Sequence, residues 1–318
     1  MKRISTMICM MLAVTLLASC AEREINKEAV YTETVPAEYL EASEKPGTVT
    51  RLDYESEDYV GRRGAVTKTA YVYTPYGYDE DDTDTRYDII YLMHGWRGHA
   101  GEDFEYPGTK NLFDNLIANG DMPPAIIVSA TFYGPYSDTD FKRSEWEVRE
   151  FHRDFREHLM PAAEGKYHTY AASVSDEDLK ASRDHRAFGG FSLGAVTTWL
   201  EFCHDNDYIR YFLPVSGSSW YYGTYGRFRI KKNVDFIEQL AEDNKLDEKG
   251  YYIYHAVGTE DSLKKQTLDM ADEMLARRDV LTADHYGLYL KDGGRHDLKA
   301  MQEFLYNALP LFFRGSTE

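Results

Sequence analysis

From about residue 48 onwards, short apolar runs rich in β-branched and aromatic residues alternate with amphipathic stretches. Eight runs have the length and composition of strands; they span residues 48–56, 69–75, 87–95, 125–132, 185–191, 211–217, 251–258 and 285–293. Six stretches have helical character, near residues 109–119, 144–164, 193–204, 233–242, 264–279 and 297–308. In the second stretch, Phe151, Phe155 and Leu159 share one helix face because they are four residues apart. This alternation predicts an α/β fold, with a mainly parallel central sheet of about eight strands and helices on both faces.

The first 19 residues differ from the rest because they join a basic start to an apolar run. The run is too short to cross a bilayer comfortably, so it indicates a secretion signal. It ends in LLASC, and small residues before a cysteine are typical of a bacterial lipoprotein processing site. We therefore expect Cys20 to become a lipidated N-terminus, anchored to the cell envelope without crossing the membrane. The alternative is ordinary cleavage near Ala18 and Ser19.

Residues 20–48 are charged and lack apolar periodicity, which predicts a flexible tether before a domain that spans residues 49–318. Loss of Lys2 and Arg3 with the signal would take the net charge from −18 to −20. Such a surface repels nucleic acid and anionic lipid, but it does not repel a neutral polysaccharide or a small ester. Once Cys9 is removed and Cys20 acylated, Cys203 has no partner for a disulfide, and we expect a small buried hydrophobic residue there.

The segment FGGFSLGAVTTW contains the pattern G-x-S-x-G, with Ser192 between Gly190 and Gly194. An apolar strand run precedes the serine and a helical stretch follows it. A serine on a tight strand-to-helix turn presents its hydroxyl above the sheet, and the glycines avoid collisions with the neighbouring strand and helix. The first turn of the helix directs backbone N–H groups at negative charge that forms beside the serine. The alternative is a capping serine in a glycine-rich turn.

A serine nucleophile needs a histidine base and a carboxylate that orients the base, and both are expected to follow the serine in the chain. His296 lies in the late loop KDGGRHDLKA, between a strand and a helix, whereas His204, His255 and His285 lie within or at the ends of predicted elements. The predicted acid is Asp261, which follows a strand in AVGTEDSL.

Glu260 is the alternative acid, because it precedes Asp261 in the same loop. Asp292 and Asp297 are too close to His296 in sequence to approach its ring easily, and solvation at the surface explains them. For the oxyanion, the N–H of Leu193 is one predicted donor. The turn after residues 87–95 offers the N–H of Trp96, or of Gly95, as the second donor, while His94 is expected to be structural.

The sequence resembles the feruloyl and acetyl-xylan esterases of carbohydrate esterase family 1 and, more broadly, the esterase-D-like α/β-hydrolases. The matching stretches follow the family's order and cover most of residues 85–313; they include YLMHGWRG, HRAFGGFSLGAVTTWLEF, YFLPVSGSSWYYG, AVGTEDS and HDLKAMQEFLYNALPLFF. The resemblance implies an α/β-hydrolase fold, with Ser192 as nucleophile, Asp261 as acid and His296 as base. It also implies that no metal or organic cofactor is required. One departure is Ala195, where relatives often carry glycine.

The resemblance implies a carboxylic-ester hydrolase that releases ferulate or a related hydroxycinnamate from plant polysaccharide such as arabinoxylan. Trp220, Tyr221 and Trp146 are candidate walls of the acyl site, although each could instead be a core or rim aromatic residue. An acetyl-xylan esterase and an esterase for siderophores or small esters are alternatives with the same fold. A glycan-binding lipoprotein without catalysis is a further alternative. The expected partners are feruloylated or acetylated xylan and its oligosaccharides, the membrane through the lipid anchor alone, and no nucleic acid.

Overall fold

The computed structural model describes residues 25–135, 140–223 and 226–313 of the chain. In these residues the strands form one nine-stranded sheet in the order β1-β9-β8-β7-β6-β4-β5-β3-β2. Neighbouring strands are parallel except where β3 pairs with β2 and with β5. The strands are β1 (Val30–Tyr31), β2 (Thr48–Glu57), β3 (Ala65–Thr74), β4 (Asp88–Met93), β5 (Ala125–Ala130), β6 (Arg186–Phe191), β7 (Tyr211–Val215), β8 (Tyr252–Gly258) and β9 (Tyr286–Lys291). The mainly parallel sheet is as predicted, with β1 as the additional strand.

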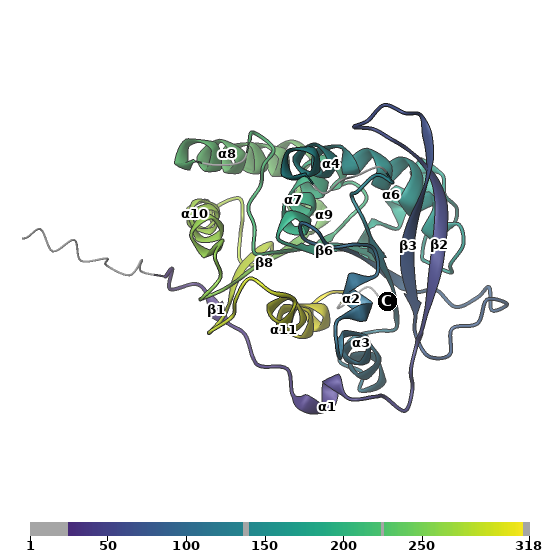
Figure 1. Cartoon of the computed structure of the whole chain (residues 1–318). Helices are drawn as coiled ribbons and strands as arrows, with labels where there is room; N and C mark the ends of the chain where they lie inside the picture. The colour runs from purple at the N-terminus through teal and green to yellow at the C-terminus, as the bar shows by residue number, and fades with distance from the viewer. Residues whose placement is uncertain (1–24, 136–139, 224–225, 314–318) are drawn as a thin grey trace, which may run out of the picture.

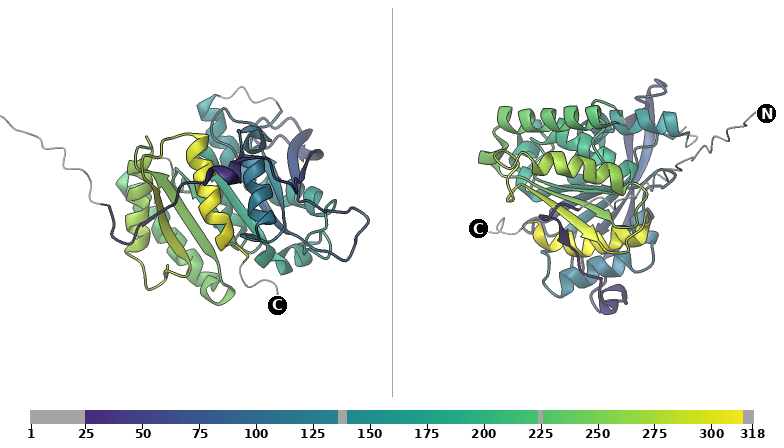
Figure 2. Two further views of the ribbon diagram at one scale, coloured as in Figure 1. Left: turned by 90° about the horizontal axis from the view of Figure 1, so that it is seen from below. Right: turned by 90° about the vertical axis from the view of Figure 1, so that its left-hand side faces the viewer.

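Helices cover both faces of this sheet, and each face has its own apolar core (Figures 1 and 2). One layer contains α4 (Phe141–Asp154), α5 (Met160–Glu164), α7 (Leu193–Asp205), α8 (Arg227–Asp243) and α10 (Lys264–Leu275). The opposite layer contains α3 (Thr109–Ala118) and α11 (Leu298–Ala308), which lie side by side in Figure 2. The shorter helices are α1 (Ala37–Leu40), α2 (Glu102–Glu105), α6 (Asp176–Ala181), η2 (Arg183–His185), α9 (Leu246–Lys249) and η3 (Leu309–Leu311).

The helix predicted over residues 144–164 consists of three parts. A π-helical turn, η1 (Phe155–Leu159), separates α4 from α5. Phe151, Phe155 and Leu159 are all buried on the side that faces the sheet, as their spacing predicts. Pro161, which has no N–H to donate to the preceding turn, lies at the start of α5, directly after this π-helical turn.

The described part of the predicted tether is packed against the domain, which corrects that expectation for residues 30–48. β1 pairs in parallel with β9 at one edge of the sheet. Further along, the Val35 N–H donates to a Glu303 carboxylate oxygen at 2.8 Å, and the Asn111 side chain donates to the Leu40 carbonyl at 2.8 Å. The composition of this segment did not predict its packing, because the contacts are made by backbone groups. Backbone hydrogen bonds leave no periodic pattern of hydrophobic residues in the sequence.

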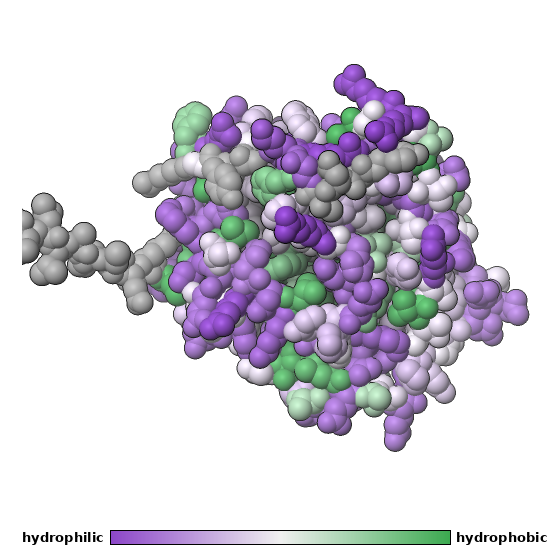
Figure 3. Space-filling model, viewed as in Figure 1, coloured by the Kyte–Doolittle hydropathy of each residue, from purple (hydrophilic) through white to green (hydrophobic). Residues whose placement is uncertain are grey.

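The predicted signal over residues 1–19 and Cys20 lie outside the described residues. Within the described part of the chain, every helix is too short or too polar to cross a bilayer. The surface in Figure 3 is mainly hydrophilic, and its hydrophobic spots are small and separate. Cys203 is a free thiol that is buried, as the sequence predicts, and burial raises the pKa of this thiol.

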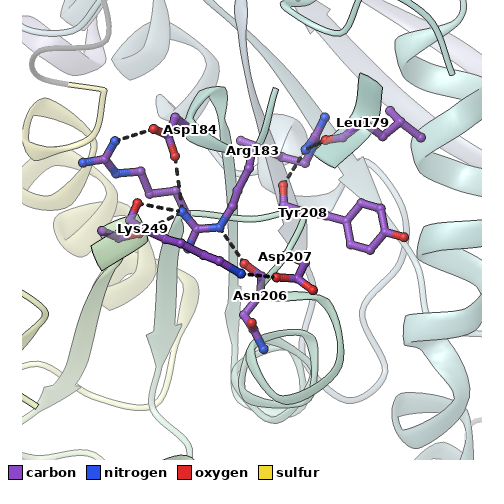
Figure 4. Close-up of polar contacts among 10 residues, drawn as sticks. Leu179, Arg183, Asp184, Asn206, Asp207, Tyr208 and Lys249 are labelled. Carbon is purple, nitrogen blue, oxygen red and sulfur yellow. Dashed lines mark hydrogen bonds and ion pairs between the residues drawn. The ribbon is translucent and has the colours of Figure 1, made fainter. Parts of the chain in front are cut away.

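Two buried arginines organise the amino end of the sheet, opposite the edge at which α/β sheets place their sites. Arg186, the first residue of β6, makes two hydrogen bonds to the Glu164 carboxylate, at 2.7 and 2.8 Å. Arg183 donates to the carbonyls of Asn206 at 2.6 Å and Gly250 at 2.8 Å, as the close-up in Figure 4 shows in part. These contacts join η2, α5, the end of α7 and the start of β8 into one rigid base.

Candidate active site

Ser192 occupies the tight turn between β6 and α7 that the sequence predicts. Its backbone has φ 59° and ψ −112°, a conformation that a residue with a side chain rarely adopts and that costs about 1–3 kcal/mol. The Ser192 N–H donates to the Val215 carbonyl of β7 at 2.9 Å, which holds the turn in place. The strained backbone therefore points the hydroxyl out from the carboxyl edge of the sheet.

The two glycines of the motif are required by the close approach of this turn to β4. A Cβ at Gly194 would lie 2.1 Å from the Met93 carbonyl oxygen. A Cβ at Gly190 would lie 2.7 Å from the same oxygen and 2.6 Å from the Gly194 backbone. Ala195, the departure from the family pattern, fits because it faces Gly217, where an added Cβ would lie 2.8 Å from the alanine methyl group.

The structure brings Ser192, His296 and Asp261 together, although they are distant in sequence. The Ser192 hydroxyl is 2.9 Å from His296 Nε2, and His296 Nδ1 is 3.0 Å from each carboxylate oxygen of Asp261. With the carboxylate accepting from Nδ1–H, Nε2 is left to accept the serine proton. The Asp261 side chain is fully buried, whereas 27% of the His296 side chain is exposed. The base is thus accessible to a substrate, and the acid is shielded from water.

Two loops carry the acid and the base, and they are held together by backbone contacts. A Cβ at Gly258, the last residue of β8, would lie 2.1 Å from the Gly294 carbonyl oxygen. The Glu260 N–H donates to that same carbonyl at 2.9 Å. Asp261 is fixed further by the Leu263 N–H, which donates to its Oδ1 at 2.6 Å. The His296 ring packs on Phe191 with 4.6 Å between ring centroids, a contact that the sequence analysis did not identify.

The other carboxylates near His296 have structural partners. Glu260, the alternative acid, forms an exposed ion pair with Arg295 at 3.0 Å. Asp292 accepts from the Thr259 hydroxyl at 3.2 Å, and Asp297 caps the start of α11 by accepting from the Ala300 N–H at 2.9 Å. Asp261 is therefore the carboxylate that is hydrogen-bonded to His296.

The predicted oxyanion donors lie on two neighbouring elements. Leu193 is the first residue of α7, next to the serine. The turn after β4 approaches from the other side, where a Cβ at Gly95 would be 3.3 Å from the Ser192 Cβ. This approach leaves Gly95 and Trp96 both as candidates for the second donor.

His94 begins this turn and is structural, as expected. Its Nδ1–H donates to the Gly95 carbonyl at 2.7 Å, and its Nε2 accepts from the Thr131 hydroxyl at 2.7 Å. Burial lowers the pKa of His94 to about 3, which keeps the ring neutral.

The predicted substrate-binding aromatics fall into different surroundings. Trp220 follows β7 and is buried; its ring lies 6.3 Å from Phe141, which in turn meets Trp96 edge-on at 5.5 Å. Phe141 and Trp96 are each 39% exposed, so this aromatic cluster reaches the surface. The sequence analysis missed Phe141, because the polar segment DTDFKRSE around it has no apolar period. Trp146 lies on α4 and is 59% exposed.

Tyr221 lies elsewhere. Its ring stacks on Phe236 of α8 at 4.3 Å and lies 5.4 Å from His204. His204 is near the end of α7 that is opposite Ser192. The neighbours of Tyr221 are therefore the packed helices, and the structure does not place this side chain with the aromatic cluster.

The remaining histidines that were predicted to be structural have such partners. His255 is buried, donates from Nε2 to the Gly217 carbonyl at 2.9 Å and accepts from the Tyr286 hydroxyl at 2.8 Å. His204 stacks on His152 at 3.8 Å, and His285 stacks on Tyr251 at 4.5 Å. Among residues 25–135, 140–223 and 226–313, no three His, Cys, Asp or Glu side chains are grouped so that they could hold a metal ion.

Comparison with known proteins places this site in a family. The Esterase family model matches residues 67–309. The feruloyl esterase module from Clostridium thermocellum, solved as a mutant complexed with sinapinate, is 30% identical with a TM-score of 0.76; the match covers 92% of this chain and 96% of that one. A carbohydrate esterase family 1 ferulic acid esterase from Anaeromyces mucronatus shares the fold, at 21% identity and a TM-score of 0.64, over 90% of this chain and 98% of that one.

A curated relative is endo-1,4-beta-xylanase Y of Acetivibrio thermocellus, which is 31% identical over 296 residues. The match covers 90% of this chain and 25% of that protein. A xylanase/feruloyl esterase of Xylanibacter ruminicola is 32% identical over 54% of this chain and 22% of its own length. The chain thus spans about a quarter of the length of the curated relatives it matches. By the family model, which matches most of its length, the chain belongs to the Esterase family.

Proposed function

We propose that this protein is a serine carboxylic-ester hydrolase that releases ferulate, or a related hydroxycinnamate, from plant polysaccharide such as arabinoxylan. The observation that carries the proposal is the hydrogen-bonded row of Ser192, His296 and Asp261 at the carboxyl edge of the sheet. The 30% identity to a feruloyl esterase module over nearly its whole length supports the choice of substrate. The relative from Xylanibacter ruminicola, whose name joins a xylanase to a feruloyl esterase, supports xylan as the carrier.

The reaction follows from the geometry of the three side chains. Ser192 Oγ attacks the ester carbonyl carbon while His296 Nε2 takes the hydroxyl proton. The carbonyl oxygen gains negative charge, and the N–H of Leu193 and that of Trp96 or Gly95 stabilise it. His296 then gives the proton to the departing sugar oxygen, which leaves an acyl-serine. Water, deprotonated by the same histidine, attacks this ester, and His296 returns the proton to the Ser192 oxygen as the acid is released. Asp261 orients the His296 ring in both steps.

We assign the flat hydroxycinnamoyl group to the aromatic cluster of Trp96, Phe141 and Trp220. Trp96 directly follows Gly95, which lies against Ser192, so this cluster begins at the reacting serine. Aromatic rings provide a rigid apolar contact surface for a planar acyl group. Trp146 lies five residues after Phe141 on α4 and is exposed, and we assign it a secondary role at the rim of the acyl site.

The test is hydrolysis of methyl ferulate, acetylated xylan and p-nitrophenyl acetate by the purified protein and by Ser192→Ala. Release of ferulate that the substitution abolishes is the expected result. Release of acetate alone would replace the proposal with an acetyl-xylan esterase. Absence of turnover on all three esters, with retained glycan binding, would refute an enzymatic role.

We also propose that the protein is exported and attached to the bacterial envelope through a lipidated Cys20. The basic and apolar start and the LLASC sequence support this proposal. Labelled palmitate should be incorporated by the wild-type chain in a bacterial host and not by Cys20→Ala. Equal labelling of the two chains would contradict it.

A further inference from the structure

A second concave site lies at the same edge of the sheet as the serine, but further towards β2. β3 is antiparallel to β5, and Tyr71 pairs with Ser129, so the residues of β3 before Tyr71 extend beyond the end of β5. Together with the loops after β4 and β5 they enclose a groove of about 450 Å³. We call this the β3 groove; its lining residues are Arg51, Thr67, Lys68, Thr69, Tyr71, His99, Ala100, Thr131, Tyr133, Gly134 and Pro135. β2 and β3 are the long pair of strands at the right of Figure 1.

The β3 groove shares its inner wall with the turn that faces Ser192. Thr131 donates to His94 Nε2 at 2.7 Å, and the Tyr133 hydroxyl accepts from the Arg97 N–H at 2.8 Å. In the sheet order, β4 and β5 lie between β6, which carries the serine, and β3. With neighbouring strands about 4.8 Å apart, the groove lies roughly 10–14 Å from the serine. This distance is too large for the atoms of the reacting ester and suits a more remote part of the same substrate.

The lining of the groove fits an uncharged, hydroxyl-rich ligand. It presents threonine hydroxyls and two half-buried tyrosine rings, and none of its lining residues is an aspartate or a glutamate, although the chain has a net charge of −18. Its cations are already paired: Arg51 with Asp53 at 2.8 Å, and Lys68 with the buried Asp154 at 2.7 Å. A fixed anionic partner would have to compete with these carboxylates. Sugar rings combine apolar faces with hydroxyl groups and match rings and hydroxyls of this kind.

The position of the β3 groove in the sheet order also distinguishes it from the site proposed for the acyl group. Trp220 of the aromatic cluster follows β7, which lies on the other side of β6 from β4, β5 and β3. An ester bound at Ser192 has an acyl part and an alcohol part that leave the reacting carbon in different directions. Trp96 and Phe141 of the cluster follow β4 and β5, and Trp220 is its buried end. With the acyl ring placed at this buried end, the alcohol part is left for the other side of the serine, where the β3 groove lies.

We propose that the β3 groove binds the xylan backbone of the substrate, several sugars away from the ester that Ser192 attacks. The proposal rests on the proposed function, which it deepens by placing the polysaccharide. Tyr71 is the central contact, because its ring packs against the loop that ends at Gly101, where an added Cβ would lie 2.8 Å from the ring, and so forms a fixed platform.

The direct test is calorimetric titration of the purified protein with xylohexaose, which carries no ester. Tyr71→Ala should weaken the Kd roughly five- to tenfold, the range expected for loss of one aromatic contact. Tyr71→Phe should bind like the wild type, because it keeps the ring. Tyr31→Ala is the matched control: Tyr31 is 55% exposed on β1, at the opposite edge of the sheet. Unchanged binding by Tyr71→Ala, or equal loss in the Tyr31 control, would overturn the inference.

Kinetics distinguish this inference from the proposed function. Methyl ferulate has no sugar, so its hydrolysis tests the proposed function alone, and Tyr71→Ala should leave both kcat and KM for it unchanged. For ferulate carried on an arabinoxylo-oligosaccharide, the same substitution should raise KM about five- to tenfold with little change in kcat. An equal loss on both substrates would show that Tyr71 supports the fold and would refute the groove. Absence of ferulate release by the wild type would refute the proposed function, while xylohexaose binding would still decide the groove.

Discussion

Replacement of Asp261 by asparagine tests the proposed acid directly, because it keeps the size of the side chain and removes its charge. His296 becomes a cation when it takes the serine proton, and both Asp261 oxygens lie 3.0 Å from its Nδ1 in a fully buried position. Opposite charges 3–4 Å apart attract by about 4–5 kcal/mol at an effective dielectric constant of 20. Loss of this attraction in the transition state lowers kcat/KM about 10³- to 10⁴-fold.

The surroundings of Asp261 add a second effect. Its Oδ1 also accepts from the Leu263 N–H at 2.6 Å. An asparagine oxygen placed there turns the amide NH₂ towards His296 Nδ1, which then has to accept a hydrogen bond. The ring is thereby held in the tautomer whose Nε2 carries a proton and cannot take one from Ser192.

The assay is steady-state hydrolysis of p-nitrophenyl acetate, with circular dichroism to show that the variant is folded. Glu260→Gln is the matched control, since it removes the neighbouring charge, whose partner Arg295 is exposed. An exposed pair of this kind contributes at most about 1 kcal/mol, so the control should retain kcat/KM within about twofold. An Asp261→Asn rate within tenfold of the wild type, or an equal loss in Glu260→Gln, would refute the assignment of Asp261.

Three further predictions concern stability. In Gly194→Ala the new Cβ would lie 2.1 Å from the Met93 carbonyl oxygen, so the free energy of unfolding measured in urea should fall by about 3 kcal/mol; no change would contradict the close approach. Arg186→Met leaves the buried Glu164 carboxylate unpaired, and chemical denaturation should show a loss of about 3–5 kcal/mol, whereas a loss below 1 kcal/mol would contradict a structural role for the pair. Burial lowers the pKa of His255 to about 4, so the folded state holds this ring neutral while the unfolded chain binds a proton near pH 6.5. The free energy of unfolding therefore carries no penalty from this histidine above pH 6.5 and declines by about 3 kcal/mol as the pH falls to 4. His255→Asn should flatten the pH dependence of the free energy of unfolding over this range. An identical slope in the variant would exclude the histidine as its source.

The sequence was sufficient for the features that depend on local pattern. The strand before Ser192 and the helix after it, each with its own periodicity, predict the strained turn. The positions of Asp261 and His296 after later strands predict that both lie at the same edge of the sheet, since parallel strands all end there. Glu260 could not be excluded from sequence, because its pairing with Arg295 depends on side-chain directions in two loops.

Features that depend on distant contacts were not predictable in the same way. β1 is two residues long and has no period of its own, so its pairing with β9 is visible only in the fold. Tyr221 adjoins Trp220 in sequence, but the chain turns between them and the two rings enter different surroundings. The β3 groove is formed by four separate segments, none of which has a recognisable binding motif; they lie at residues 51, 67–71, 99–100 and 131–135.

The docking of the N-terminal segment has a consequence for where the protein can work. Four residues lie between Cys20 and Ile25, which already packs against the domain. Even when fully extended, the chain from Cys20 to Ile25 spans no more than about 18 Å. Under the proposed lipid attachment, the catalytic domain would therefore stay next to the bilayer, with the edge strand β1 nearest the anchor and the β3 groove at the far edge of the sheet. Such an enzyme would act on chains that are brought to the cell surface, and fibres that remain at a distance would be out of its reach.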